Sequence, residues 1–223
     1  MVVSDIHGFP ETSAELPDAG SSQRHGLQLA DLSGRSDLRG DALHDHLFNQ
    51  GGMSHAVRAL REIDGRGCLG IGFSAGGTAL WNAVKEGLEL QALICVSSTR
   101  LRFETSPLDI PTMVFWGELD PYRPPESWNN AVPTCWKTYA GKQHDFYRLD
   151  ALAAQSSLRS DIAAFVEGRH EAAEYDKWFR EQVGEAIREA DDPNTVWIPN
   201  EVVKEQMARE RAELLARLKA EAK

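Results

Sequence analysis

Short apolar runs alternate with helical stretches along the first three quarters of the chain. Five apolar runs are typical of β-strands, at residues 2–6, 68–73, 90–96, 112–116 and 135–139, and a weaker run lies at 27–32. Apolar residues recur at helical spacing over 53–63, 75–86 and 152–166. Strands that alternate with helices predict an α/β fold, with a mainly parallel sheet and helices on both of its faces.

The pattern changes near residue 168, where the strand signal ends. An apolar stripe at helical spacing follows, formed by Tyr175, Trp178, Phe179, Val183, Ala186 and Ile187. Residues 191–194 form a breaker, and a second helical stretch begins near residue 199. We therefore predict an α/β domain over residues 1–167 and a two-helix tail over residues 168–223.

The composition is that of a globular protein with an acidic balance. Of the 223 residues, 42% are hydrophobic and 26% are charged, which argues against wholesale disorder. The net charge of −10 argues against unspecific binding to nucleic acid or to an anionic membrane. No apolar run reaches the roughly 20 residues that a membrane span needs. The tail holds 10 Lys and Arg against 13 Asp and Glu, so most of the acidity lies in residues 1–167.

Cysteine usage and the first residues of the chain predict a cytoplasmic protein. Cys68, Cys95 and Cys135 are an odd number and form no CxxC pair, which argues against a disulfide scaffold and a structural zinc site. The first residues lack the basic region and the apolar core of a signal peptide. Cys95 lies inside an apolar run, where we expect a small buried hydrophobic residue.

The pentapeptide Gly72-Phe73-Ser74-Ala75-Gly76 is a G-x-S-x-G motif. Small flanking residues allow a tight, strained turn between a strand and a helix, and this turn presents the serine hydroxyl. The backbone N–H of Ala75 can then donate to an oxyanion that forms at the substrate. The motif alone fits a plain glycine-rich turn equally well. The apolar strand before it and the helical stretch after it favour a catalytic Ser74.

Two further candidates follow the next strands of the sheet. Asp120 comes directly after the strand at 112–116, and His144 comes after the strand at 135–139. The order Ser, Asp, His is that of α/β-hydrolases, in which each residue follows the carboxyl end of a strand. His144 would take the Ser74 proton, and Asp120 would orient the imidazole. Taken singly, Asp120 also fits a turn residue and His144 a surface histidine, and Glu118 and Asp145 are rival carboxylates.

Residues 1–167 resemble the dienelactone hydrolase group of α/β-hydrolases. The resemblance is carried by the Ser74 motif and by three further segments, Asp5-Ile6-His7-Gly8, Gly117-Glu118-Leu119-Asp120 and Gly141-Lys142-Gln143-His144-Asp145-Phe146. It implies that the backbone N–H of Ile6 is the second oxyanion donor and that Asp5 lies near the nucleophile. Our hypothesis is a serine hydrolase that acts on a small ester or similar acyl compound.

The sequence differs from that group in three ways, and these differences change the fold and the activity that we expect. The nucleophile is Ser74 where the group typically has cysteine, which favours a serine esterase or acyl hydrolase. The first strand begins at residue 2, and the stretch 10–26 leaves little room for the usual first helix. We therefore expect a small, N-terminally truncated α/β-hydrolase fold. A degenerate hydrolase that retains the three residues is the alternative.

The tail resembles the small two-helix antitoxins, also called stability determinants, that neutralise ParE-type toxins. The matching segments are Tyr175-Asp176-Lys177-Trp178-Phe179-Arg180, Asp192-Pro193 and Ile198-Pro199-Asn200-Glu201-Val202. The resemblance implies a ParE-like toxin as a partner of residues 168–223, with Tyr175, Trp178, Phe179 and Val183 in the interface. The same stripe could instead cover the hydrolase domain or pair with a second copy of the chain.

No cofactor or metal site is predicted. The chain has no P-loop and no dinucleotide-binding fingerprint. His44 and His46 lie two residues apart and so would not share a helix face, and we expect them in a solvated loop. The sequence thus favours a serine hydrolase fused to an antitoxin-like tail. The alternative is a toxin-neutralising interaction protein in which the hydrolase part is a scaffold.

Overall fold

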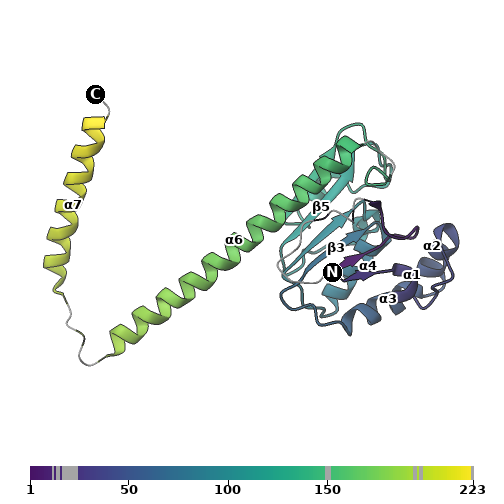
Figure 1. Cartoon of the computed structure of the whole chain (residues 1–223), viewed down its shortest axis with the longest axis horizontal. Helices are drawn as coiled ribbons and strands as arrows, with labels where there is room; N and C mark the ends of the chain where they lie inside the picture. The colour runs from purple at the N-terminus through teal and green to yellow at the C-terminus, as the bar shows by residue number, and fades with distance from the viewer. Residues whose placement is uncertain are drawn as a thin grey trace. The chain divides into compact units, whose positions relative to one another are not determined.

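A parallel sheet is the centre of the fold. The computed structural model describes residues 1–11, 13, 16, 25–148, 152–192, 195 and 198–221. Within these residues, six strands form one sheet in the order β2-β1-β3-β4-β5-β6, and every neighbouring pair is parallel (Figure 1). The strands are β1 (Val2–Val3), β2 (Gly26–Leu27), β3 (Leu69–Phe73), β4 (Ala92–Val96), β5 (Thr112–Gly117) and β6 (Cys135–Tyr139). The prediction of a mainly parallel α/β fold is confirmed.

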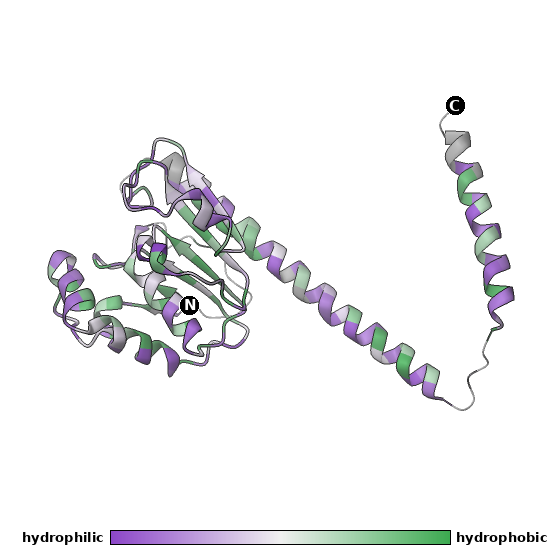
Figure 2. Cartoon of the chain, turned by 180° about the vertical axis from the view of Figure 1, so that it is seen from behind, coloured by the Kyte–Doolittle hydropathy of each residue, from purple (hydrophilic) through white to green (hydrophobic). Residues whose placement is uncertain are grey.

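The central strands are apolar throughout because both faces of the sheet are covered. Every residue of β3 and β4 is buried, and their register pairs Leu69 with Ala92 and Phe73 with Val96. In the edge strand β6, exposed and half-buried residues instead alternate over the first four positions, and the last residue, Tyr139, is buried. Figure 2 shows the strands of the sheet coloured mainly as hydrophobic.

Helices pack on both faces of the sheet. The helices are α1 (Leu29–Leu32), α2 (Gly40–Asn49), α3 (Gly52–Arg61), α4 (Ala75–Lys85), α5 (Glu126–Asn129), α6 (Leu152–Asp191) and α7 (Asn200–Glu221), with a short 3₁₀ helix η2 (Thr99–Phe103). Buried residues of α1 to α4 share one apolar cluster with Leu93 and Cys95 of β4. Leu158 and Ile162 of α6 belong to a second cluster with Ile94. Successive side chains of β4 thus enter opposite cores.

Two local predictions were wrong. The run at 27–32 is not a strand, because β2 ends at Leu27 and α1 begins at Leu29, whose N–H donates to Ser4 Oγ at 3.0 Å. His44 and His46 lie in helix α2 and not in a solvated loop. Leu43 and Leu47 of α2 are fully buried, and their burial holds this stretch in a helix. The expectation for the stretch 10–26 falls largely outside the described residues.

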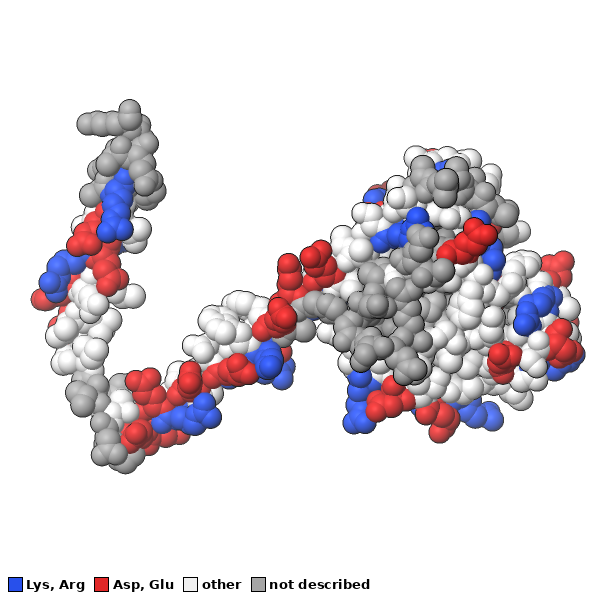
Figure 3. Space-filling view, viewed as in Figure 1, with Lys and Arg blue, Asp and Glu red and all other residues white. Residues whose placement is uncertain are grey.

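The chain divides into two compact units, Met1–Ala172 and Ala173–Lys223. Helix α6 is continuous through the boundary that the composition change marks near residue 168. The second unit therefore consists of the end of α6 and of α7. Figure 3 shows acidic and basic side chains intermixed along α7 and along the end of α6. Among the described helices, none is both long enough and apolar enough to cross a membrane.

Candidate active site

Ser74 occupies a strained turn between β3 and α4. Its φ of 48° and ψ of −115° are rare for a residue that carries a side chain. The flanking glycines are required by close backbone packing. A Cβ at Gly72 would lie 2.3 Å from Gly77 Cα, and a Cβ at Gly76 would lie 2.2 Å from the Ser4 carbonyl oxygen. The small residues of the motif thus allow the turn that presents the Ser74 hydroxyl.

Ser74, His144 and Asp120 form a continuous hydrogen-bonded chain. Ser74 Oγ lies 3.1 Å from His144 Nε2, and His144 Nδ1 lies 2.6 Å from Asp120 Oδ2. The Asp120 carboxylate is buried and also accepts the Tyr122 N–H at 2.9 Å. These distances fit the imidazole tautomer with its proton on Nδ1, which leaves Nε2 free to accept from the serine hydroxyl.

The sheet explains why these three residues meet. Ser74 follows β3, Asp120 follows β5 and His144 follows β6, and the carboxyl ends of parallel strands lie at one edge. The rival carboxylate Glu118 accepts the Gly141 N–H at 2.7 Å. The structure therefore brings Asp120 to the His144 imidazole, while the Glu118 carboxylate bonds to the loop backbone.

Ser97 holds the loop that carries His144, and the sequence patterns did not identify it. Ser97 directly follows β4, has a φ of 52° and is fully buried. Its hydroxyl donates to the His144 carbonyl oxygen at 2.6 Å. The only sequence signal is the pair Ser97-Ser98, which directly follows a strand of apolar residues. This bond fixes the backbone of His144 against the end of a central strand.

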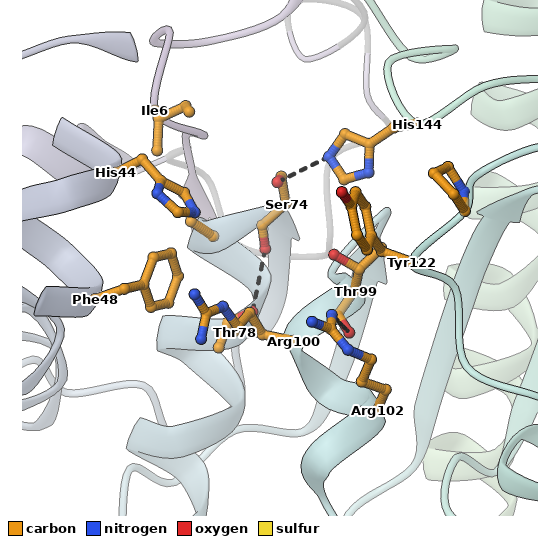
Figure 4. A pocket seen from close by; sticks show the side chains of 12 residues that line it. Ile6, His44, Phe48, Ser74, Thr78, Thr99, Arg100, Arg102, Tyr122 and His144 are labelled. Carbon is orange, nitrogen blue, oxygen red and sulfur yellow. Dashed lines mark hydrogen bonds between the residues drawn. The ribbon is translucent and has the colours of Figure 1, made fainter. Parts of the chain in front are cut away.

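Ser74 opens on a cavity of about 600 Å³. Figure 4 shows the serine and histidine side chains at this cavity. The cavity is lined by residues from several separate segments of the first unit. They are Ile6, His44, Phe48, Ser74, Ala75, Thr78, Thr99, Arg100, Arg102, Pro121, Tyr122 and His144. Ile6 and Ala75, the two predicted oxyanion donors, thus line the same cavity as the serine and the histidine. Their catalytic role stays a prediction.

Asp5, which the resemblance puts near the nucleophile, has its carboxylate engaged elsewhere. Arg148 donates to both of its oxygens at 2.5 Å, and Tyr147 donates its hydroxyl at 2.8 Å. The His7 N–H is a fourth donor, at 2.7 Å, and Asp5 is only 2% exposed. Burial and then the Asp5 carboxylate raise the pKa of the Tyr147 hydroxyl well above its usual range. Asp5 is not among the residues that line the cavity around Ser74.

Several cavity residues were not identified from the sequence. His44 and Phe48 come from α2, with their rings 4.8 Å apart, and the Arg100 guanidinium lies 4.0 Å from the centre of the Phe48 ring. Arg102 and Tyr122 complete the opposite side in Figure 4. The helical spacing of Leu43 and Leu47 could have revealed α2. No sequence pattern marks the arginines as residues of the cavity.

The described residues contain no group of three or more His, Cys, Asp or Glu side chains that could hold a metal ion. His46 points away from His44 and has its Nε2 3.1 Å from the Ser33 carbonyl oxygen. Cys95 is fully buried, as expected for a small hydrophobic residue. Burial raises the pKa of the Cys95 thiol, which keeps it protonated and unreactive.

The apolar stripe of the second unit is a separate candidate site. The side chains of Tyr175, Trp178 and Phe179 are 64%, 53% and 50% exposed. The Tyr175 ring lies 5.6 Å from the Trp178 ring and 6.4 Å from the Phe179 ring, measured between centroids. Val183, one turn further along α6, is 39% exposed. These four residues form one aromatic and aliphatic surface, and their role in binding a partner stays a prediction.

No family model matches the chain, and no curated relative matches its sequence. Solved structures of α/β-hydrolases are similar to it. A Klebsiella pneumoniae protein assigned as a dienelactone hydrolase has 18% identity over 74% of this chain and 85% of that one, with a TM-score of 0.48. A Thermoplasma acidophilum protein assigned as a CIB-like hydrolase has 16% identity over 53% of this chain and 62% of that one, with a TM-score of 0.42.

Thermogutta terrifontis esterase 2 has 19% identity over 52% of this chain and 61% of that one, with a TM-score of 0.38. The chain thus spans less than two thirds of the Thermoplasma and Thermogutta proteins. At these identities and TM-scores the similarity carries no statement about activity.

Proposed function

We propose that the chain is a serine hydrolase that cleaves a small ester with Ser74 as the nucleophile, His144 as the general base and Asp120 as its orienting carboxylate. The observation that carries the proposal is the hydrogen-bonded chain of these three side chains at a cavity of about 600 Å³. A strained nucleophile turn, a base within hydrogen-bond reach and a third group that orients the base are the parts this chemistry needs.

In the acylation step, Ser74 Oγ attacks the carbonyl carbon of the ester while His144 Nε2 takes the hydroxyl proton. A carbon–oxygen bond forms, and the carbonyl electron pair moves to the oxygen. The backbone N–H groups of Ala75 and Ile6 stabilise that oxyanion in this proposal, and Ala75 stands at the N-terminus of α4, where the helix dipole adds to the effect. The bond to the leaving oxygen then breaks, and His144 donates its proton to the departing alcohol.

In the deacylation step, water attacks the acyl-enzyme carbonyl and gives its proton to His144. The bond between Ser74 Oγ and the acyl carbon breaks, His144 returns the proton to the serine, and a carboxylic acid leaves. Asp120 orients the imidazole and stabilises the imidazolium that forms twice in each cycle. Its buried carboxylate, held by the Tyr122 N–H, suits this role.

The test is turnover of 4-nitrophenyl acetate by the full chain and by Ser74→Ala. We expect the variant to lose on the order of a million-fold in kcat, because the nucleophile is gone. Ser54→Ala, at an exposed position of α3, is the matched control and should keep the wild-type rate. A fluorophosphonate probe should add one covalent mass to the wild type and none to Ser74→Ala. Equal rates for wild type and Ser74→Ala would refute the proposal.

We also propose a second function, in which the second unit binds a basic protein partner through Tyr175, Trp178, Phe179 and Val183. The supporting observation is the exposure of this stripe, since large aromatic side chains at half exposure or more favour burial against another surface. The resemblance to two-helix antitoxins makes a ParE-like toxin the partner to test.

This second proposal is tested with the full chain co-expressed with a ParE-like toxin. We expect the wild type and Ser74→Ala to rescue growth and to co-purify with the toxin. A Trp178→Ala, Phe179→Ala double variant should lose both effects. Leu214→Ala is the matched control, because it removes a 59% exposed apolar side chain of α7 outside the antitoxin-like stretch. Failure of the wild-type chain to bind the toxin would contradict the proposal.

A further inference from the structure

Two arginines line the cavity beside the proposed nucleophile. Arg100 and Arg102 lie on η2, which begins three residues after β4 ends, so they stand at the same sheet edge as Ser74. Both side chains are half-buried. In Figure 4 their guanidinium groups face the space that Ser74 and His144 also face. The backbone thus brings two permanent positive charges to the site of the proposed reaction.

Neither arginine has a carboxylate partner among the residues that the structure describes. The Arg100 guanidinium lies over the Phe48 ring at 4.0 Å. Arg102 donates to the Thr99 carbonyl oxygen at 2.8 Å and lies 4.3 Å from the centre of the Phe103 ring. Aromatic rings and one carbonyl therefore take the place of counter-ions at both guanidinium groups.

Several other arginines of the chain do have a carboxylate partner. The sequence has 34 Asp and Glu against 24 Lys and Arg, so carboxylates are the commoner charge. Arg35 and Arg66 pair with neighbouring aspartates at the surface, and Arg148 pairs with the buried Asp5. Burial and then the charge of Arg102 lower the pKa of Arg100, so the two guanidinium groups repel each other. An anion placed between them would relieve that repulsion.

We propose that Arg100 and Arg102 form an anion-binding subsite, here named the arginine subsite, and that the ester carries an oxyanion group, a carboxylate or a phosphate, at its non-reacting end. This inference rests on the proposed hydrolase function and names the substrate class of that site. Guanidinium groups match both oxyanions because their N–H donors fit two oxygens at once. The ester carbonyl lies at Ser74 and the charged end lies at η2.

The rest of the cavity defines the body of the substrate. Ile6, Phe48 and Tyr122 add apolar side chains to its wall. A cavity of about 600 Å³ has room for a single ring or a short chain. A small aromatic or aliphatic ester with one charged end therefore satisfies the apolar walls and the arginine subsite together.

The first test compares three esters that share one acetyl group. These are 4-acetoxybenzoate with a carboxylate, 4-acetoxyphenyl phosphate with a phosphate, and methyl 4-acetoxybenzoate without charge. We expect the wild type to have a higher kcat/KM for at least one anionic ester than for the neutral ester. The better of the two anions identifies the natural charged group as carboxylate or phosphate.

The second test is the ratio of kcat/KM for the preferred anion to kcat/KM for the neutral ester, in Arg100→Gln and in Arg102→Gln. We expect each substitution to lower this ratio about tenfold, the effect of one charge-assisted hydrogen bond at a half-buried site. Arg58→Gln, at an exposed position of α3, removes the same charge and should leave the ratio unchanged. An unchanged ratio in both cavity variants overturns the arginine subsite.

A binding measurement separates this inference from the proposed function. Calorimetry with 4-hydroxybenzoate and phenyl phosphate requires no turnover and is performed on Ser74→Ala as well as on the wild type. Binding that weakens about tenfold in Arg100→Gln or Arg102→Gln supports the arginine subsite even if no ester is hydrolysed. Ester hydrolysis without any preference for anions, and with no binding of either anion, overturns the subsite and leaves the hydrolase proposal standing.

Discussion

The two units of the chain handle their apolar residues in opposite ways. In Met1–Ala172, apolar side chains from both faces of the sheet are buried in two clusters, and the candidate active site lies at the sheet edge. In Ala173–Lys223, the described apolar side chains are largely exposed, from Tyr175 on α6 to Leu215 on α7. The first unit thus derives its stability from a buried interior, whereas the described apolar side chains of the second unit remain largely exposed.

The sharpest test of this comparison separates the two functions. Asp120→Asn leaves the shape of the site intact but favours the wrong imidazole tautomer of His144, so we expect kcat for 4-nitrophenyl acetate to fall roughly 10,000-fold. Binding of a partner through Trp178 and Phe179 should not change. The measurements are steady-state kinetics and co-purification of the same variant. A variant that loses both together would show that the two units do not act independently.

The second test compares the stability that one apolar side chain contributes in each unit. Phe115 is fully buried in β5, so Phe115→Ala should lower the free energy of unfolding by about 3–5 kcal/mol. Leu215 of α7 is 50% exposed, and Leu215→Ala should change it by less than about 0.5 kcal/mol. Urea denaturation monitored by tryptophan fluorescence and by circular dichroism gives both values. Similar losses for the two variants would contradict the comparison.

An ion pair in each unit gives a third contrast. In the first unit, Asp5 pairs with Arg148, and their side chains are 1% and 20% exposed. In the second unit, Arg180 pairs with Asp176, and their side chains are 78% and 57% exposed. Arg148→Met should cost about 3 kcal/mol, because it leaves a buried carboxylate without its cation. Arg180→Met should cost less than about 0.5 kcal/mol, because solvent screens an exposed pair.

The reason for the Arg148→Met loss can be checked separately. If an uncompensated carboxylate causes it, adding Asp5→Asn to Arg148→Met should recover part of the unfolding free energy. Thermal unfolding of the single and double variants is the measurement. A double variant that is less stable than Arg148→Met would assign the loss to packing of the arginine stem instead.

The sequence predicted the position of a residue correctly where the regular arrangement of parallel strands determines it. Apolar runs located β3, β4, β5 and β6, and in a parallel sheet this is enough to bring Ser74, Asp120 and His144 to one edge. The sequence was uninformative where a contact between distant segments decides the conformation. The bond from the Leu29 N–H to Ser4 Oγ begins α1 where the apolar pattern indicates a strand.

The cavity walls were not predictable for a related reason. Arg100 and Arg102 reach the cavity because η2 turns directly after β4, and the short basic stretch that contains them equally fits an exposed loop. His44 reaches it because Leu43 and Leu47 bury one side of α2. Side chains that only line a site follow no spacing rule, whereas the nucleophile and its partners follow the strand ends.

The smallest expected effect concerns Ser97, which holds the His144 loop against β4. Ser97→Ala removes the bond to the His144 carbonyl oxygen and keeps a side chain at a φ of 52°, whereas Ser97→Gly removes both the bond and the backbone strain. We expect both variants to lose about fivefold in kcat, because the bond contributes about 1 kcal/mol to placing the histidine. Ser97→Gly should nevertheless be more stable than Ser97→Ala by about 1 kcal/mol.

If Ser97 were only structural, kcat would follow stability and the glycine variant would be the more active of the two. Equal kcat values at unequal stabilities would instead assign Ser97 the role of a positioning residue.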